Sequence, residues 1–318
     1  YVAQEYCLVS GGLPRAVVIG GGATGCGVAR DMSIRGFQVT LVEYRGIGSG
    51  TSSRFHGLLQ SGARYAVSDG AFAAECMRER KIIEEVAPSV VELTGGLFVS
   101  LPEDPEEFSN QFIVGCERAD ISCEELPVLR AMKLEPRLIK SVQRVFSVPD
   151  AMLNPWKMLE LLVEDIRYRG GEILTQHQVT GFQIRNDRVT GVFLQGNGER
   201  LLLEADVVVN AAGPWADQVL ATSVGRTAKN VRLVQGSHIV VCKMFDHDRS
   251  YLFQTSDKRV VFAIPYQQDY TLIGTTDLDH EGDPSDTEVT PQEVSYLCDA
   301  VNRYFNHAVS EDDVVWSY

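Results

Sequence analysis

Short apolar runs bounded by glycines open the chain. Residues 15–20 and 38–43 are mainly apolar, which is typical of parallel strands buried on both faces. Between them, Val28 and Met32 are spaced for one helix face over residues 23–35, and Gly36 ends that helix. The pattern predicts a strand–helix–strand unit with short connections.

Hydrophobic patterns typical of helices and of strands continue along the rest of the chain. Helical spacing of apolar residues covers residues 71–86, 105–119 and 155–169. A fourth helix is expected over residues 290–305, where Thr290 and Glu293 occupy capping-box positions. Strand patterns cover 96–101, 141–148, 172–179, a hairpin over 181–195 turning at Asn186-Asp187, and 206–210, before a helix opening at Pro214. From residue 230 to 277 strand follows strand, which indicates an antiparallel sheet.

The buried runs at 15–20, 38–43, 172–179 and 206–210 are expected to form one parallel sheet. They are far apart in sequence, so the domain that contains them must be discontinuous. We therefore predict an α/β fold with a Rossmann-like domain and a second, mainly antiparallel domain.

Composition is that of a soluble globular protein: 318 residues, 44% hydrophobic and 23% charged. No apolar run is long enough for a transmembrane helix. The formal net charge of −14 argues against nucleic-acid binding, which needs clustered Lys and Arg, but allows a local basic pocket for a small anion. Seven scattered cysteines without a C-x-x-C motif predict no metal site and a reducing, cytoplasmic location, and we see no signal peptide.

The first candidate site is a glycine-rich turn between the first strand and the first helix. Gly20 allows a tight turn, Gly22 lets the backbone approach a pyrophosphate, and Gly25 lets the helix pack on the strand. Glu43, at the end of the second strand, suits a ribose diol and argues against a 2′-phosphate. Together these four residues predict a dinucleotide site.

Two other segments are weaker candidates for cofactor contact. Thr51, Ser52 and Ser53 follow the Glu43 strand, and their position favours phosphate or ribityl contact over a merely flexible loop. Ala212 and Gly213 follow the strand at 206–210, where small residues would admit a bulky ring. That second segment could equally be an ordinary strand–helix joint.

Arg64-Tyr65 and His238 are candidates for substrate chemistry. An arginine can hold a carboxylate or phosphate with two hydrogen bonds, although an Arg-Tyr pair is more often a surface feature. His238 could accept a proton, although its spacing is more typical of a histidine hydrogen-bonded within a sheet.

Several motifs in order make the chain resemble the FAD-dependent glycerol-3-phosphate dehydrogenases of the D-amino-acid-oxidase-like flavoproteins. The motifs are Val18-Ile-Gly-Gly-Gly-Ala-Thr-Gly, Gly50-Thr-Ser-Ser, His56-Gly-Leu-Leu-Gln-Ser-Gly-Ala-Arg-Tyr65, Val208-Val-Asn-Ala-Ala-Gly-Pro-Trp215, Gln235-Gly-Ser-His-Ile-Val240 and Ile273-Gly-Thr-Thr-Asp277. The resemblance covers nearly all of residues 15–318.

The resemblance implies FAD on the glycine-rich turn, with Val179 among its contacts, and oxidation of sn-glycerol 3-phosphate to dihydroxyacetone phosphate. Arg64 and Tyr65 would line the substrate pocket, with His238 and position 60 in catalytic roles. Electrons would pass to a quinone or a partner subunit. We expect FAD-binding segments at 15–94 and 149–230, and substrate-domain segments at 95–148 and 231–318. We expect a cytoplasmic location, which is compatible with peripheral attachment of the protein to the inner face of the cytoplasmic membrane.

The chain departs from the family pattern at two places. Gln60 stands where the family commonly has histidine, and glutamine cannot serve as a general base. His238 would then carry that role, or His56 compensates, or turnover is slow. The family also continues beyond Trp316-Ser-Tyr318 into an arginine-containing segment, so we expect a truncated chain that lacks the last FAD-domain segment.

Two alternatives stay open. Within the superfamily, the substrate could be another small anion, such as a 2-hydroxy acid or an amino acid. In a different class, the chain could be a non-catalytic flavin-binding subunit.

Overall fold

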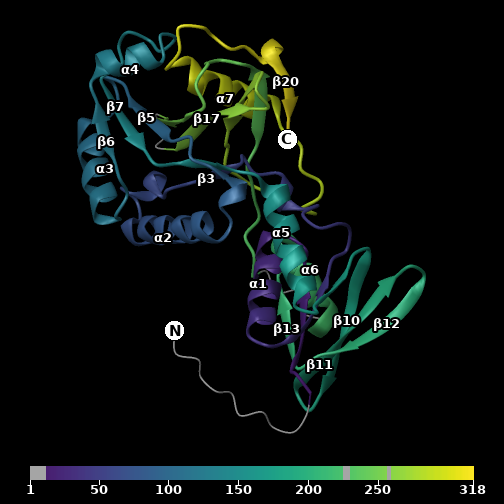
Figure 1. Ribbon diagram of the computed structural model, residues 1–318. Coiled ribbons are helices and arrows are strands. Elements are labelled where there is room, and N and C mark those ends of the chain that lie inside the picture. The colour runs from purple at the N-terminus through teal and green to yellow at the C-terminus, as the bar shows by residue number, and fades with distance from the viewer. Residues whose placement is uncertain (1–11, 225–229, 256–258) are drawn as a thin grey trace. The chain divides into compact units, whose positions relative to one another are not determined.

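The computed structural model describes residues 12–224, 230–255 and 259–318, which fold as two compact units (Figure 1). Unit 1 comprises Tyr1–Ser53 and Pro155–Arg232, and unit 2 comprises Arg54–Asn154 and Leu233–Tyr318. Each unit is built from two separate stretches of chain, as the sequence predicts.

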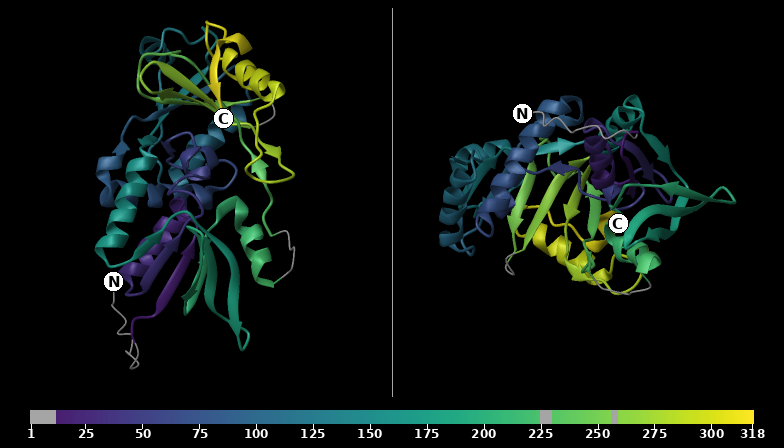
Figure 2. Two further views of the ribbon diagram at one scale, coloured as in Figure 1. Left: turned by 90° about the vertical axis from the view of Figure 1, so that its right-hand side faces the viewer. Right: turned by 90° about the horizontal axis from the view of Figure 1, so that it is seen from below.

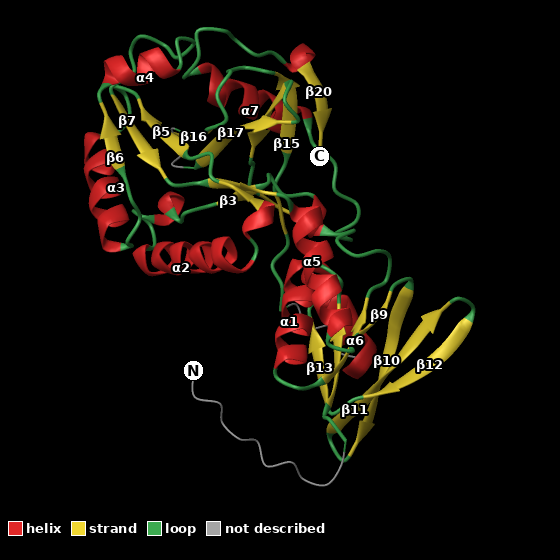
Figure 3. Ribbon diagram, viewed as in Figure 1, coloured by secondary structure: helices red, strands yellow, loops and turns green. Residues whose placement is uncertain are grey.

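Unit 1 is centred on a parallel sheet in the order β13-β1-β2-β9. Its strands are β1 (Arg15–Ile19), β2 (Gln38–Val42), β9 (Glu172–Leu174) and β13 (Val207–Asn210). Helices α1 (Ala23–Ile34) and α5 (Pro155–Tyr168) pack together on one face, where Val18, Leu41 and Ile166 are fully buried (Figure 3). The prediction that residues 206–210 lie in the same parallel sheet as residues 15–20 is confirmed.

The other face of that sheet is covered by an antiparallel sheet. Its strands are β10 (His177–Arg185), β11 (Arg188–Gly196) and β12 (Glu199–Glu204), and α6 (Ala216–Val224) packs beside β10. Asn186 and Asp187 both adopt positive φ, as the tight hairpin turn between β10 and β11 requires. The predicted hairpin is therefore present.

One strand prediction is wrong in unit 1. Residues 172–179 do not form a single strand, because the parallel strand ends at Leu174 and Gln176 takes a positive φ. The chain then turns into β10, so Val179 belongs to the antiparallel sheet and is buried in the core between the two sheets. No glycine or proline stands at this break, so the sequence does not mark it.

Unit 2 is built on a sheet in the order β20-β15-β18-β17-β16-β5-β7-β6, with every neighbouring pair antiparallel except β16 with β5 (Figure 2). The strands are β5 (Gly96–Ser100), β6 (Glu124–Leu126), β7 (Arg144–Val148), β15 (His238–Cys242), β16 (Ser250–Gln254), β17 (Val260–Tyr266), β18 (Tyr270–Gly274) and β20 (Val314–Ser317). The mainly antiparallel second domain is confirmed.

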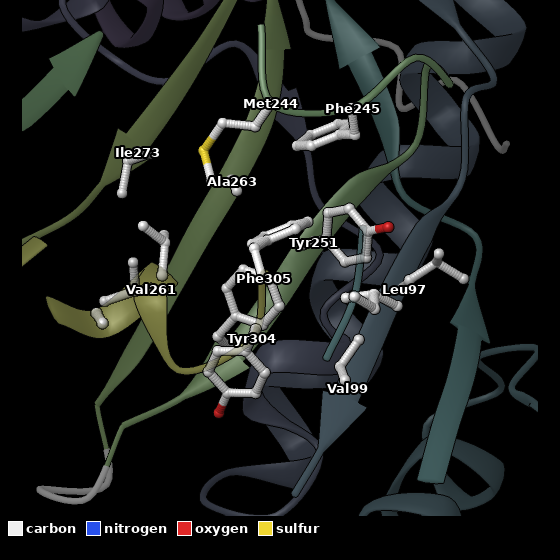
Figure 4. Packing of buried hydrophobic residues seen from close by; sticks show 14 of the residues in the cluster. Leu97, Val99, Met244, Phe245, Tyr251, Val261, Ala263, Ile273, Tyr304 and Phe305 are labelled. Atoms are coloured by element: carbon white, nitrogen blue, oxygen red, sulfur yellow. The ribbon is translucent and has the colours of Figure 1, made fainter. Parts of the chain in front are cut away.

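Both faces of the unit 2 sheet are apolar. Helices α4 (Val128–Leu134) and α7 (Pro291–Asn302) cover one face, where Tyr251, Phe253 and Tyr304 pack together. Figure 4 shows Tyr251, Tyr304 and Phe305 of this cluster. Helices α2 (Gly70–Val86) and α3 (Glu106–Arg118) cover the other face. The predicted capping box of Thr290 and Glu293 begins α7.

The first domain boundary differs from the expectation. Residues 54–94 belong to unit 2 and not to the unit with the glycine-rich turn. Short strand β3 (Leu58–Leu59) pairs with β8 (Ala151–Leu153), which also pairs with β4 (Val91–Glu92), and α2 buries Ala73 and Met77 against the unit 2 sheet. The remaining boundaries fall after Asn154 and Arg232.

Short helical turns and strands complete the two units. They are η1 (Thr51–Ser53), η2 (Ala63–Tyr65), η3 (Pro88–Val90), η4 (Gly213–Trp215), η5 (Glu311–Asp313), β14 (Val234–Gln235) and β19 (Leu278–Asp279).

Candidate functional site

The glycine-rich turn of unit 1 has no room for side chains. Gly20 adopts φ +109°, and a Cβ there would overlap the carbonyl oxygen of Ala211. A Cβ on Gly25 would overlap the carbonyl oxygen of Gly20. The glycines therefore allow α1 to start close against β1 and against the chain leaving β13.

The start of α1 fits a phosphate group. Gly22 is the N-cap residue and has no side chain with which to cap the helix. The Ser52 hydroxyl accepts a hydrogen bond from the Ala23 amide at 2.9 Å, which brings the η1 segment to the helix N-terminus. Free amides and the helix dipole at this end favour an anion such as a pyrophosphate.

Glu43 lies directly beside the turn. Its carboxylate accepts hydrogen bonds from the backbone amides of Gly21 and Arg45, each at 2.7 Å. Carboxylate oxygens can accept further hydrogen bonds, so these two leave capacity for a ligand hydroxyl. Glu43 therefore both orders the turn and presents an acceptor next to it.

The structure brings some of the other expected cofactor residues to this turn. The chain after β13 runs beside Gly20, because Ala211 donates to the Ile19 carbonyl at 2.8 Å and a Cβ on Gly20 would lie 3.0 Å from Cα of Ala212. Gly213 follows at the start of η4.

The remaining expected cofactor residues lie less directly at the turn. Thr51 and Ser53 lie in η1 with Ser52, but none of their described contacts reaches the turn. Val179 is buried between the sheets and contributes no polar group.

Of the candidate substrate residues, His238 lies on a rung of the unit 2 sheet, whereas Arg64 and Tyr65 lie in η2. Neighbouring strands pair Tyr318 with His238, His238 with Gly274, and Gly274 with Phe262. Because directly paired residues project to the same face, these side chains belong to the face covered elsewhere by α2 and α3. The sheet register therefore brings together residues that are far apart in sequence.

The imidazole ring of His238 is buried, and no described residue is hydrogen-bonded to it. Its side chain is enclosed and, among the described residues, neither Nδ1 nor Nε2 has a partner. Its ring stacks on Tyr318 with centroids 5.1 Å apart and an interplanar angle of 18°. Burial lowers the pKa of His238 to about 4, so the ring is neutral at pH 7 and has a lone pair available. The alternative of a histidine hydrogen-bonded within the sheet is wrong.

Gly274 makes room for that ring. A Cβ at position 274 would overlap the imidazole of His238. The space beside the His238 ring is also bounded by the His56 ring, whose centroid lies 6.1 Å from that of His238 and 5.5 Å from that of Phe262. A glycine opposite a histidine on paired strands is thus a structural requirement of this site.

Arg64 is a cation in the same neighbourhood, and it forms no ion pair with a described carboxylate. Its guanidinium lies 5.4 Å from the Tyr65 ring centroid and 5.9 Å from that of Phe262. No carboxylate of the described residues lies within ion-pair distance of it, and the side chain is only partly exposed. Aromatic faces hold such a group in place and leave its N–H donors for a ligand.

The loop that carries Gln60 and Arg64 is anchored by a buried carboxylate. Asp150 accepts hydrogen bonds from both the amide and the hydroxyl of Ser61, each at 2.7 Å. Gly62 then adopts φ +91° and begins η2, which carries Arg64 and Tyr65. This anchoring fixes the loop and, with it, the position of Arg64.

A second buried carboxylate holds the segments that flank His238 and Gly274. Glu293 accepts hydrogen bonds from the hydroxyls of Ser237 at 2.8 Å and Thr276 at 2.6 Å. Burial opposes ionisation, but the hydrogen bonds from Thr276, Thr290 and Ser237 outweigh it and lower the pKa of Glu293. The ionised carboxylate of α7 therefore ties both strand ends of the site together.

Phe262, Tyr318 and Gly274 are candidate site residues that sequence reasoning missed. Each has the sequence context of an ordinary strand residue, and only the register between strands shows that they surround His238. The local signal that could have found one of them is the glycine in Ile273-Gly274, since glycine inside a strand often marks close approach of another group.

Within the described residues, no group of three or more His, Cys, Asp or Glu side chains is arranged to hold a metal ion. None of the described helices is both long enough and apolar enough to cross a bilayer.

Comparison with known proteins gives a family match and several relatives. The sequence model of the FAD dependent oxidoreductase family matches residues 15–318. A subunit of the anaerobic glycerol-3-phosphate dehydrogenase of Escherichia coli (strain K12) is 38% identical over 287 residues, which cover 88% of this chain and 52% of that protein. D-erythritol 1-phosphate dehydrogenase of Brucella abortus (strain 2308) is 33% identical over 312 residues, covering 95% of this chain and 62% of that protein.

Among solved structures, the glycerol-3-phosphate dehydrogenase from Bacillus halodurans complexed with FAD matches with a TM-score of 0.75 and 26% identity. The match covers 96% of this chain and 56% of that one. The chain thus spans about half the length of the first curated relatives it matches.

Proposed function

The chain belongs to the FAD dependent oxidoreductase family, and from this we propose that it takes part in the oxidation of sn-glycerol 3-phosphate to dihydroxyacetone phosphate. FAD is the cofactor of the family, and the turn at Gly20–Gly25 with Glu43 fits a dinucleotide. The observation that carries the choice of substrate is that Arg64, without a carboxylate partner among the described residues, lies in the same unit as His238, whose ring nitrogens have no described partner.

Each residue has a role that its environment supports. Arg64 binds the phosphate, because its guanidinium has no competing carboxylate among the described residues. His238 accepts the proton of the substrate's secondary hydroxyl, because burial keeps its ring neutral. Phe262 and Tyr318 keep water away from the His238 ring, and Tyr65 lines the pocket beside Arg64.

The proposed reaction is a two-electron oxidation of the secondary alcohol of the substrate. The secondary carbinol loses a hydride from carbon and a proton from oxygen, and becomes the ketone. FAD, when bound, supplies the two-electron acceptor for that hydride. We propose that the electrons then leave to a quinone or to a partner protein, since the relative from Escherichia coli is named as one subunit of its enzyme. Peripheral attachment at the cytoplasmic membrane would suit either acceptor.

A substrate comparison tests this function. FAD-loaded protein is mixed without oxygen with sn-glycerol 3-phosphate, D-erythritol 1-phosphate, a 2-hydroxy acid or an amino acid, and flavin absorbance is followed. We expect sn-glycerol 3-phosphate to bleach the flavin fastest. D-Erythritol 1-phosphate is included because the relative from Brucella abortus is named for it. If it bleaches the flavin faster, the substrate is still a polyol phosphate but is not sn-glycerol 3-phosphate. Bleaching only by the carboxylate substrates would overturn the proposal.

A further inference from the structure

His56 and Gln60 form a hydrogen-bonded pair beside His238 and on the same loop as Arg64. As the carboxamide of Gln60 is placed, its Nε2 lies 3.0 Å from Nε2 of His56. On its other side, Nδ1 of His56 accepts a hydrogen bond from the Leu58 amide at 3.0 Å. Both ring nitrogens of His56 are therefore engaged.

The hydrogen bond from Leu58 determines which nitrogen of His56 carries the proton. An amide N–H can donate only to a nitrogen with a free lone pair, so Nδ1 is unprotonated. A neutral imidazole then has its hydrogen on Nε2. Burial, with smaller contributions from His238 and Arg64, lowers the pKa of His56 to about 3, so the ring stays neutral at physiological pH.

An Nε2–H group in His56 requires an acceptor from Gln60. The amide nitrogen of Gln60 facing it would place donor against donor, whereas the carbonyl oxygen satisfies it. The two ends of a carboxamide exchange places by a half turn, so the hydrogen-bond pattern decides between them. We therefore infer that the carboxamide is turned by half, so that its oxygen faces His56 and its amide group faces away, where no contact of Gln60 with a described residue is found.

We propose that Gln60 is a hydrogen-bond donor to an oxygen of the bound substrate, and that His56 is the positioning residue that keeps the carboxamide in this orientation. The proposal rests on the function proposed above for its substrate. It gives Gln60 a binding role in place of the general base that glutamine cannot be.

The surroundings of His56 suit a positioning role. Its ring contacts the rings of Phe55, Phe262 and His238, with centroids between 5.5 and 6.1 Å apart. With Nδ1 committed to Leu58 and Nε2 protonated, His56 has no lone pair for a substrate proton. His238 remains as the histidine of this cluster with free ring nitrogens.

A nuclear magnetic resonance measurement tests the orientation without any substrate. The FAD-loaded protein is labelled with ¹⁵N-histidine, and long-range ¹H–¹⁵N spectra at pH 7 report the tautomer of each ring. The His56 signal is identified by its loss in His56→Asn. We expect the Nε2–H tautomer. An Nδ1–H tautomer would overturn the assignment, whatever the substrate.

Rapid-reaction kinetics test the donor role. Gln60→Ala should raise the apparent Kd for sn-glycerol 3-phosphate in flavin reduction about tenfold, and change the limiting rate less than about twofold. His56→Asn keeps an acceptor for Leu58 but loses the contact to Gln60, so it should weaken binding similarly. The double variant should bind no worse than Gln60→Ala, because the two residues act through one hydrogen bond. Gln111→Ala, on the exposed side of α3, is the control.

The outcomes separate the inference from the function. Unchanged Kd in both single variants, or additive losses in the double variant, would overturn the donor and positioning roles alone. A falling limiting rate with unchanged Kd would also contradict them. Absence of flavin reduction in the wild-type protein would overturn the proposed function and the donor role with it, while the tautomer would still decide the orientation.

Discussion

Arg64 is the residue on which the proposed substrate binding depends most. The protein has a net charge of −14, so its overall field repels a phosphorylated substrate. Local attraction by a partly buried guanidinium, which can hold two phosphate oxygens at once, must overcome that repulsion.

Arg64→Ala should therefore lower the efficiency of flavin reduction by sn-glycerol 3-phosphate at least tenfold, since a charge-assisted contact of this kind contributes about 2–4 kcal/mol. FAD should remain bound, because the substitution leaves the glycine-rich turn and Glu43 unchanged. Arg78→Ala, which removes an exposed arginine from α2, is the matched control. If Arg64→Ala reduces its flavin nearly as efficiently as the wild-type protein, Arg64 does not bind the substrate.

His238 should determine the acid side of the pH profile. Its folded pKa of about 4 means that the ring remains a competent base down to that pH, well below the usual range for histidine. The limiting rate of flavin reduction should accordingly decline only below about pH 5.

His238→Asn should reduce the limiting rate of flavin reduction about 100-fold or more at pH 7, which is the usual contribution of a general base. The decline of that rate at acid pH should also disappear. His307→Asn, at an exposed position of unit 2, is the control. An acid limb that persists in His238→Asn would assign the proton acceptor to another group.

Glu43 is expected to bind the adenosine ribose. Glu43→Ala removes an acceptor whose hydrogen bonds to hydroxyls contribute about 1.5–3 kcal/mol each, so FAD should dissociate at least tenfold more readily. Because Glu43 also accepts from Gly21 and Arg45, the thermal midpoint of the FAD-free protein is measured in parallel. Glu199→Ala, an exposed position of β12, is the control, and full flavin retention in Glu43→Ala would contradict the assignment.

At the scale of elements, the joint between β1 and α1 depends on Gly25. Gly25→Ala would drive a Cβ into the carbonyl oxygen of Gly20, so either the turn or the helix must shift. We expect a loss of stability of about 2 kcal/mol or more, together with weaker FAD binding.

Gly27 lies in the same helix and provides the comparison. A Cβ there meets nothing within 4 Å, so Gly27→Ala should be neutral or stabilise the helix by up to about 1 kcal/mol. Chemical denaturation of the two variants measures both values. Equal effects would show that helix propensity, and not close packing against the turn, determines the cost.

The elements that could be predicted are those whose sequence signals are local. The run at residues 15–20, the glycines after it and the Asn186-Asp187 turn each depend on near neighbours along the chain. The rung that pairs Tyr318, His238, Gly274 and Phe262 depends on register between distant strands, so only the separate motifs could be recognised. The break after Leu174 likewise has no strong local signal.

At the scale of the whole molecule, the two units divide the proposed chemistry. Unit 1 holds the turn suited to FAD, and unit 2 holds Arg64 and His238. Residues 54–94 follow the cofactor strands in sequence but pack on the unit 2 sheet. The expected boundary at residue 94 is wrong because β3 and α2 are anchored by contacts to β8 and to Phe98 and Phe146, which adjacency in sequence does not reveal.

The central proposal is that the chain oxidises sn-glycerol 3-phosphate through FAD. The most direct measurement is an anaerobic single turnover, in which FAD-loaded protein receives excess sn-glycerol 3-phosphate and both flavin and product are quantified. The account predicts full flavin reduction with one dihydroxyacetone phosphate formed per flavin. Flavin that stays oxidised with the substrate, yet is readily reduced by dithionite, would contradict it.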